Sequence, residues 1–192
     1  MKKNFSKIIL GLLVLVLVVG CRSSSSNDDD FSTTSNKYYY TAKLDGVETN
    51  FLHTAILQGG GNGGRMEHIV LAGYIKSFPT TGNANDTPPA FVFEIWNMGG
   101  NITAGIYDGV KGGSYDDDSP DTYSLDAEYL PSVTTQFDAA DTKNFVLNIT
   151  ELSKENGIKA TFSGTLTSRD FPGKTITVTD GKLYLPFNKL VP

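Results

Sequence analysis

Apolar and polar residues alternate with a period of two through most of the chain after residue 38, in short runs separated by turn residues. In the run that holds the single tryptophan, Phe91, Phe93 and Ile95 alternate with Glu94 and Trp96. Successive side chains of a β-strand point to opposite faces, so this pattern predicts strands with one buried face.

The strand-like runs are short and turn signals separate them. We expect strands over residues 38–44, 47–51, 68–75, 90–96, 102–107, 122–130, 145–150, 158–166, 176–178 and 183–187. The run 68–75 has apolar residues on both faces, which is typical of a central strand. Short strands without a helical period predict an all-β antiparallel domain. We expect a two-sheet β-sandwich, with a closed antiparallel β-barrel as the alternative, because the pattern fits both.

Several connections have turn chemistry of their own. Asp45-Gly46 predicts a tight hairpin, and Asp180-Gly181 predicts a turn or a bulge. The glycine-rich stretch 59–64 predicts a mobile loop, because glycine loses much conformational freedom in regular structure. We expect further connections over 108–121 and 131–142.

Residues 1–20 have the order of a secretory signal peptide, with basic residues followed by an apolar run. That run, residues 8–19, has twelve residues, whereas a membrane span needs roughly 20. The segment ends in Val18-Val19-Gly20-Cys21, which resembles the lipobox of bacterial lipoproteins. The resemblance implies that Cys21 carries acyl chains such as palmitate, is the first mature residue and anchors the protein in a membrane. The alternative is a chance cysteine after an ordinary signal.

Residues 21–37 are rich in Ser, Asn, Asp and Thr, which predicts a flexible polar tether. Within it, Ser23–Asp30 resembles the acidic tract that follows the acylated cysteine in Bacteroidota lipoproteins. That resemblance implies an outer-membrane lipoprotein exposed at the cell surface. The alternative is a solvated spacer without a sorting role. Residues 38–192 then form a single domain.

The domain opens with 40–47 (Tyr-Thr-Ala-Lys-Leu-Asp-Gly-Val) and closes with 158–166 (Ile-Lys-Ala-Thr-Phe-Ser-Gly-Thr-Leu) and 176–187 (Ile-Thr-Val-Thr-Asp-Gly-Lys-Leu-Tyr-Leu-Pro-Phe). These segments resemble a family of small Bacteroidota surface lipoproteins. The match leaves out the middle of the domain. It implies a β-rich surface lipoprotein, and it assigns no catalytic residue.

Charge and cysteine content exclude several functions. The formal net charge is −5, and removal of residues 1–20 takes away three lysines and no acid, which leaves −8. Such a surface repels nucleic acid, so we expect no nucleic-acid partner. Cys21 is the only cysteine, so the domain has no intrachain disulfide, thiol nucleophile or zinc–cysteine site.

Candidates for catalysis are few. The chain has two histidines, His53 and His68, and no Gly-x-Ser-x-Gly motif, so spacing assembles no nucleophilic triad. A glycoside hydrolase needs two facing carboxyl groups. Glu94, Asp126 and Glu128 lie on predicted strands and are candidates, although acids on strand surfaces are more often solvated.

An acidic segment offers a calcium hypothesis. Asp108, Asp116, Asp117, Asp118 and Asp121 supply the oxygen ligands that Ca²⁺ prefers, although their order does not match an EF-hand. The alternative is a solvated acidic loop. The sequence indicates no other cofactor.

Aromatic residues offer a carbohydrate hypothesis, because sugar rings stack on aromatic faces. We expect exposed rings at Trp96, Tyr107, Tyr115 and Tyr123, with Glu94 beside Trp96. An aromatic ring at the end of a strand also closes the edge of a core, which is the alternative for Trp96.

These observations together predict a surface-anchored lipoprotein with a non-catalytic binding domain for a glycan or a surface protein. One alternative is a glycan-degrading hydrolase with its acids on strands. The other is a structural or accessory subunit of a cell-envelope complex.

The anchor hypothesis predicts the mature amino terminus. We expect mass spectrometry of the purified protein to find Cys21 as the first residue, with acyl chains attached. An unmodified terminus, or one at another residue, would contradict the lipoprotein interpretation.

Overall fold

The computed structural model describes residues 37–77, 87–111, 123–139, 144–189 and 191. They belong to one compact unit, Asn36–Pro192. In these ranges the chain forms strands and turns only, and they contain no helix with the length and apolar character of a membrane span.

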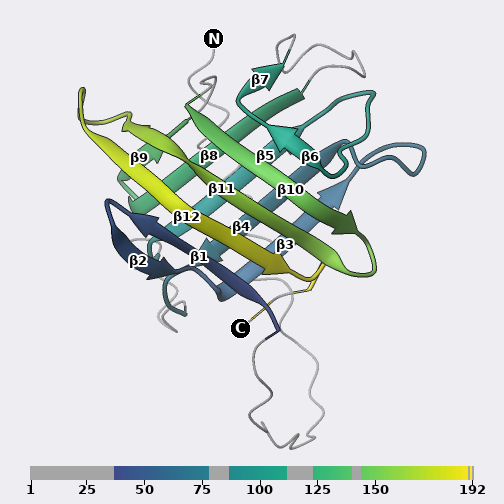
Figure 1. Cartoon of the computed structure of the whole chain (residues 1–192), viewed down its shortest axis with the longest axis horizontal. Coiled ribbons are helices and arrows are strands. Elements are labelled where there is room, and N and C mark those ends of the chain that lie inside the picture. The colour runs from purple at the N-terminus through teal and green to yellow at the C-terminus, as the bar shows by residue number, and fades with distance from the viewer. Residues whose placement is uncertain (1–36, 78–86, 112–122, 140–143, 190, 192) are drawn as a thin grey trace, which may run out of the picture. The chain divides into compact units, whose positions relative to one another are not determined.

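The described residues form twelve strands (Figure 1). Their bounds are β1 (Tyr39–Leu44), β2 (Val47–Asn50), β3 (His53–Gly60), β4 (His68–Tyr74), β5 (Ala90–Trp96), β6 (Gly105–Tyr107), β7 (Val110–Lys111), β8 (Tyr123–Ser132), β9 (Thr135–Asp138), β10 (Phe145–Ser153), β11 (Gly157–Ser168) and β12 (Thr175–Leu185). All ladders between named strands are antiparallel, so the predicted all-β antiparallel fold is confirmed.

The sheet folds into two layers that face each other (Figure 1). The front layer has the order β2-β1-β12-β11-β10-β6, and the back layer has the order β9-β8-β5-β4-β3, with β7 beside β8. β11 links the layers, because its last residues pair with β9. On the other side, Asn188 donates its backbone N–H to the carbonyl of Leu57, and Ala55 and Val191 exchange two backbone hydrogen bonds. The fold therefore has the two layers of a sandwich and the linked edges of a barrel.

Aromatic side chains fill the space between the layers. Six of these aromatic residues are each at most 3% exposed: Tyr40, Phe51, Phe91, Phe93, Phe145 and Phe162. The hydroxyl of Tyr40 in the front layer donates to the carbonyl of Phe91 in the back layer over 3.1 Å. The rings of Phe93 and Phe162 meet edge to face, with centroids 4.9 Å apart. Burial of such a ring stabilises the fold by roughly 1.5–3 kcal/mol.

Glycines on the inner faces make room for these rings. A Cβ atom on Gly73 would lie 2.5 Å from the Tyr40 ring and would also meet the backbone oxygen of Phe51. Gly181 lies opposite Phe162 in the ladder between β12 and β11, and a Cβ atom there would meet the Phe162 ring. The close approach of the two layers thus depends on Gly73, whereas Gly181 makes room for a ring of its own layer.

Both predicted tight connections are present. Leu44 pairs with Val47, and the two intervening residues have positive φ angles, 49° at Asp45 and 82° at Gly46, as a type I′ turn requires. In β12 the pairing register with β11 shifts just before Gly181, and Asp180 has φ 53°. Asp180-Gly181 is therefore a bulge inside a continuous strand rather than a turn.

The structure corrects some predicted boundaries. β3 and β9 were not expected, and β7 lies in a segment expected to be a connection. β3 is irregular because Thr54, with φ 50°, interrupts its register with β4. Its last two residues, Gly59 and Gly60, belong to the stretch expected to be a mobile loop. That stretch is held instead, because the Glu67 carboxylate accepts from the backbone N–H of Asn62.

The inner-face glycines give a test of the packing. We expect Gly73→Ala to destabilise the full-length protein by about 2 to 3 kcal/mol. The added methyl group would collide with the Tyr40 ring and with the backbone oxygen of Phe51, and both would have to move away from β4. Gly60→Ala is the matched control, because nothing lies within 4 Å of its Cβ position. It should change stability by less than about 1 kcal/mol. Denaturant unfolding measures both, and equal effects would contradict this account.

Candidate functional site

The two layers present chemically different outer faces. Each layer buries its inner face against the other, so alternate residues of a strand point outward. The outer face of the back layer holds four acids, the carboxylate cluster: Glu94, Asp126, Glu128 and Asp138. The outer face of the front layer and its edge hold the tyrosine–lysine face: Lys37, Tyr38, Tyr39, Lys43, Lys159, Lys182 and Tyr184.

Strand register brings the carboxylate cluster together. Glu94 of β5 lies opposite Asp126 of β8, and Glu128 of β8 lies opposite Asp138 of β9. Residues directly opposite each other in antiparallel strands have Cβ atoms about 4.5–5.5 Å apart, and like charges at that distance repel. The predicted convergence of Glu94, Asp126 and Glu128 on one face is therefore present.

Neighbouring side chains hold these acids in place. The contacts are His68 Nε2 with Glu94 Oε1 at 2.8 Å, Gln136 Nε2 donating to Glu128 Oε1 at 2.5 Å, and an ion pair between Arg169 and Asp138. Little of the acids reaches solvent, since the side chains of Glu94 and Asp138 are each 14% exposed. The cluster is thus a packed network rather than an open acidic surface.

One acid of the network keeps its proton at neutral pH. Burial raises the pKa of Glu128 to about 8, and the negative charge of Asp126 adds to the rise. Arg169 acts in the opposite direction with a smaller effect. A carboxyl group that keeps its proton is one of the two groups that glycoside hydrolysis needs.

The calcium candidates fall mostly outside the described residues. Only Asp108 is described, and its Oδ1 accepts a hydrogen bond from the Tyr123 hydroxyl over 2.8 Å. Asp116, Asp118 and Asp121 lie outside those ranges, as does Cys21. Within the part of the chain that the structure describes, no three acids or histidines are placed to hold a metal ion. The calcium site stays a prediction.

The predicted aromatic candidates do not share one surface. Trp96 lies on the outer face of the back layer beside Glu94, and its indole stacks on the His68 ring with centroids 3.6 Å apart. Tyr107 was expected to be exposed, and this is wrong: it is 6% exposed and packs edge to face on Tyr123. Its hydroxyl donates to the backbone of Thr103.

Tyr107 faces the interior because β6 pairs with β10, which places its ring in the core cluster rather than near Trp96. A ring this buried offers little surface for stacking on a sugar. Tyr115, the remaining aromatic candidate, lies outside the described residues.

The tyrosine–lysine face is a second aromatic site. The Tyr184 ring lies edge to face with its two neighbours, at centroid distances of 5.1 Å to Tyr38 and 6.1 Å to Tyr39. Lysine ammonium groups lie over the rings: Lys37 5.3 Å and Lys159 4.8 Å from the centroid of Tyr184, and Lys182 6.0 Å from that of Tyr39. Tyr39 is 37% exposed.

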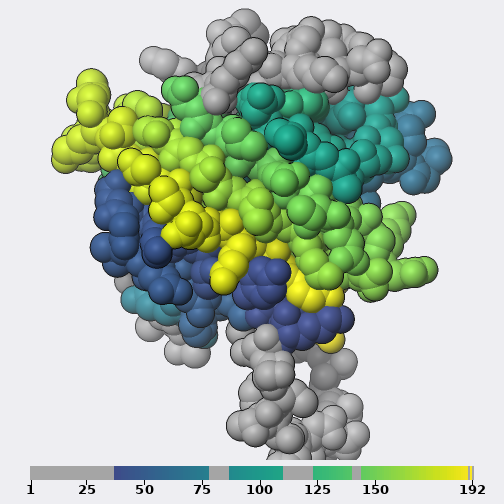
Figure 2. Space-filling view, in the orientation of Figure 1, coloured from purple at the N-terminus to yellow at the C-terminus, as the bar shows by residue number. Residues whose placement is uncertain are grey.

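A shallow hollow of about 330 Å³ continues this face across β10, β11 and β12. Its side chains come from Val146, Asn148, Thr161, Ser163, Asp180 and Lys182. Figure 2 shows these strands, in green and yellow, on the surface that faces the viewer. The bulge at Gly181, which has no side chain, forms part of the floor of the hollow. Lys182 belongs to both the hollow and the tyrosine–lysine face, so the two are continuous.

Sequence reasoning missed this face because its residues are distant in the chain. Tyr39 lies directly opposite Tyr184, and Lys159 lies opposite Tyr184 from the other side. Both segments were expected to be strands, but their pairing was not. The signal in the sequence was the run of three tyrosines at residues 38–40. Only alternate side chains of a strand face the core, so at least one of these rings had to lie on the outer face.

Comparisons of the chain with protein-family models, with curated proteins and with solved structures found no match. The two outer faces of the sheet are therefore the features of the molecule that bear on its function.

The carboxylate cluster predicts a pH dependence of stability. Glu128 has a folded-state pKa of about 8 against an ordinary 4.5, so the folded state holds a proton that the unfolded chain releases. Stability should therefore fall as the pH rises from about 4.5 to about 8, by at most about 5 kcal/mol from this group.

Glu128→Gln removes this dependence while keeping an acceptor for Gln136. We expect the variant to be more stable than the wild type at pH 8, with a difference that shrinks towards zero near pH 4.5, as measured by thermal unfolding across the range. A variant that is less stable by the same amount at both pH values would contradict the protonated state of Glu128.

Proposed function

We propose that this chain is a surface-anchored lipoprotein whose β domain binds glycan without catalysis, through the tyrosine–lysine face and its hollow. The observation that carries the proposal is the juxtaposition of the exposed Tyr39 ring, lysine ammonium groups and a shallow hollow on one outer face of the sheet. Tyr184 is only 7% exposed, and it packs edge to face against Tyr39 and Tyr38.

The chemistry of this face suits carbohydrate. Sugars present flat apolar ring faces edged with hydroxyl groups, and they bind where aromatic faces adjoin hydrogen-bonding side chains. Tyr39 supplies an exposed ring, and Asn148, Thr161 and Ser163 supply hydrogen-bonding groups in the hollow. The open, shallow form suits a chain that lies along the sheet better than a small molecule that needs enclosure.

The acids of this face support binding rather than hydrolysis. Asp180 forms an ion pair with Lys43 at 2.7 Å, and Glu151, at the edge of the face, forms one with Lys159 at 2.6 Å. The partner lysine lowers the pKa of each carboxyl group, so both are ionised at neutral pH. A glycoside hydrolase also needs a carboxyl group that holds a proton.

The predicted anchor suits this role. The polar tether between Cys21 and Lys37 has 15 residues, and a flexible chain of that length has a root-mean-square span of about 20 Å. Lys37 is both the first described residue and a member of the tyrosine–lysine face. The proposed face would therefore stay close to the membrane surface and to the polysaccharides outside it.

A second candidate function is glycan hydrolysis at the carboxylate cluster. It is favoured by the raised pKa of Glu128 and by the lateral pairing of Glu94 with Asp126. Release of reducing ends from a glycan by the wild type, together with its loss in Glu128→Gln, would establish this candidate instead.

The binding proposal predicts the effect of one exposed ring. We expect the full-length protein to bind members of a glycan array, and Tyr39→Ala to weaken that binding by about three- to ten-fold through lost stacking. Phe171→Ala is the control, because Phe171 is also exposed, at 46%, and lies outside the face. Absence of glycan binding, or equal loss in both variants, would overturn the proposal.

A further inference from the structure

We infer that the ligand of the tyrosine–lysine face is an acidic polysaccharide, with sugar carboxylates paired to the lysines and a sugar ring lying on the exposed Tyr39. This inference rests on the proposed function and specifies its ligand class.

The first argument is the distribution of charge. The whole chain has a net charge of −5, yet this face gathers Lys37, Lys43, Lys159 and Lys182. Two of the four form the ion pairs with Asp180 and Glu151. Glu48 lies opposite Lys43 on β2 and is a third acid of this face. The face therefore has four lysines and three acids, an excess of one positive charge against the negative net charge of the whole chain. Complementary charge at a binding surface selects an anionic partner.

The second argument is the position of the ammonium groups relative to the rings. Lys182 lies over Tyr39, at 6.0 Å from the ring centroid, and Lys37 lies over Tyr184 at 5.3 Å. A uronic acid carries its carboxylate directly on the sugar ring. A ring stacked on Tyr39 would place its carboxylate within reach of the Lys182 ammonium, and a neutral sugar cannot form that ion pair.

The third argument concerns the hollow beside the rings. Asn148, Thr161 and Ser163 present amide and hydroxyl groups there, and Lys182 stands between the hollow and Tyr39. A polysaccharide that follows the sheet would form hydroxyl hydrogen bonds in the hollow. Beside the hollow it would stack on Tyr39 and pair its carboxylates with the lysines. An anionic lipid surface is the competing partner for lysines and tyrosines. Its headgroups form a flat layer, whereas a single extended polysaccharide chain can follow the shallow hollow across β10, β11 and β12.

The test compares acidic polysaccharides with neutral copies of themselves. The probes are polygalacturonate, polymannuronate and hyaluronate oligomers, each beside its carboxyl-reduced counterpart, which has the same backbone without the charge. We expect the full-length protein to bind at least one acidic member at least about ten-fold more tightly than its reduced form. That preference should fall as salt rises from about 0.05 M to 0.5 M, because exposed charges are screened.

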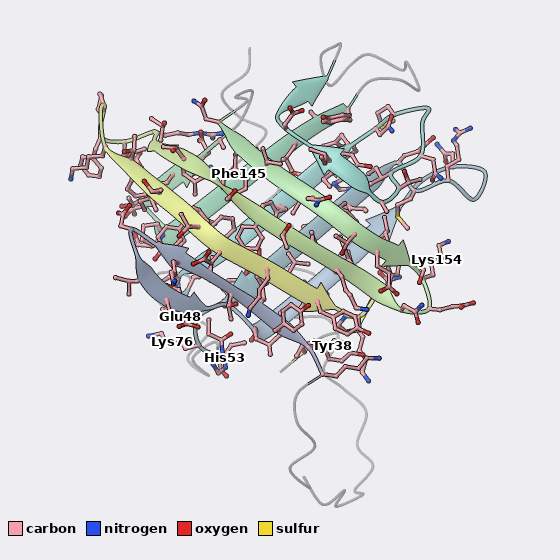
Figure 3. All side chains as sticks on the ribbon, in the orientation of Figure 1. Tyr38, Glu48, His53, Lys76, Phe145 and Lys154 are labelled. Carbon is pink, nitrogen blue, oxygen red and sulfur yellow. The ribbon has the colours of Figure 1, made fainter. Side chains whose placement is uncertain are left out.

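Variants locate the effect. We expect Lys182→Gln to weaken binding of the acidic oligomer about five-fold. Binding of the reduced form should weaken less than two-fold, because the glutamine amide can still hydrogen-bond sugar hydroxyl groups. Lys76→Gln makes the same change of charge away from the face, and Figure 3 shows Lys76 well apart from Tyr38. It should change binding less than two-fold. Thermal midpoints equal to that of the wild type show that both variants are folded, as expected for exposed side chains.

The outcomes separate this inference from the proposed function. Equal binding of acidic and reduced oligomers would overturn the inference and leave glycan binding standing. Binding of no glycan, here or on the array, would overturn both. Binding only to vesicles that contain anionic lipid would also overturn the inference, and would make the tyrosine–lysine face a lipid contact.

Discussion

The contact between the two layers at Tyr40 is the constraint on which the rest of the structure depends. Its ring lies against Gly73 of the back layer, and its hydroxyl satisfies the carbonyl of Phe91. Phe162, opposite Gly181, fills the space beside it. The buried rings pack against inner-face glycines and stabilise the contact between the layers. The outward-facing side chains are therefore not needed to pack the core. Their side chains can then serve another purpose.

The outer faces of the two layers differ in the charge and exposure of their side chains. On the back layer, Glu94 and Asp138 are largely withdrawn from water and held by a histidine and an arginine, and Glu128 keeps a proton. On the front layer, lysines stand in solvent above tyrosine rings. A buried network with its own internal partners has little left to offer an outside ligand. The exposed Tyr39 ring and the ammonium groups near it can still gain contacts, which is why we propose the front face as the binding face.

Local pattern predicted the elements whose evidence is local. The alternation of 90–96 matches β5 residue for residue, and the same alternation placed Glu94 and Trp96 on one face. It could not reveal that Tyr39 meets Tyr184, because that contact depends on the pairing of strands from opposite ends of the domain. Strand β3 escaped prediction because a bulge and terminal glycines interrupt its pattern. The burial of Tyr107 likewise follows from the pairing of β6 with β10.

The linkage of the sheet across its ends also bears on when the domain can form. β1 pairs with β2 on one side and with β12 on the other, and β3 pairs with β4 and bonds to the residues after β12. The earliest strands therefore find their second neighbours only in the last part of the chain to be made. Contacts of such sequence separation form slowly. A chain that leaves the ribosome amino terminus first therefore lacks β12, the second partner of β1, until synthesis is nearly finished. Such a topology keeps the domain from closing until nearly the whole chain has been made, because the barrel-like closure comes last.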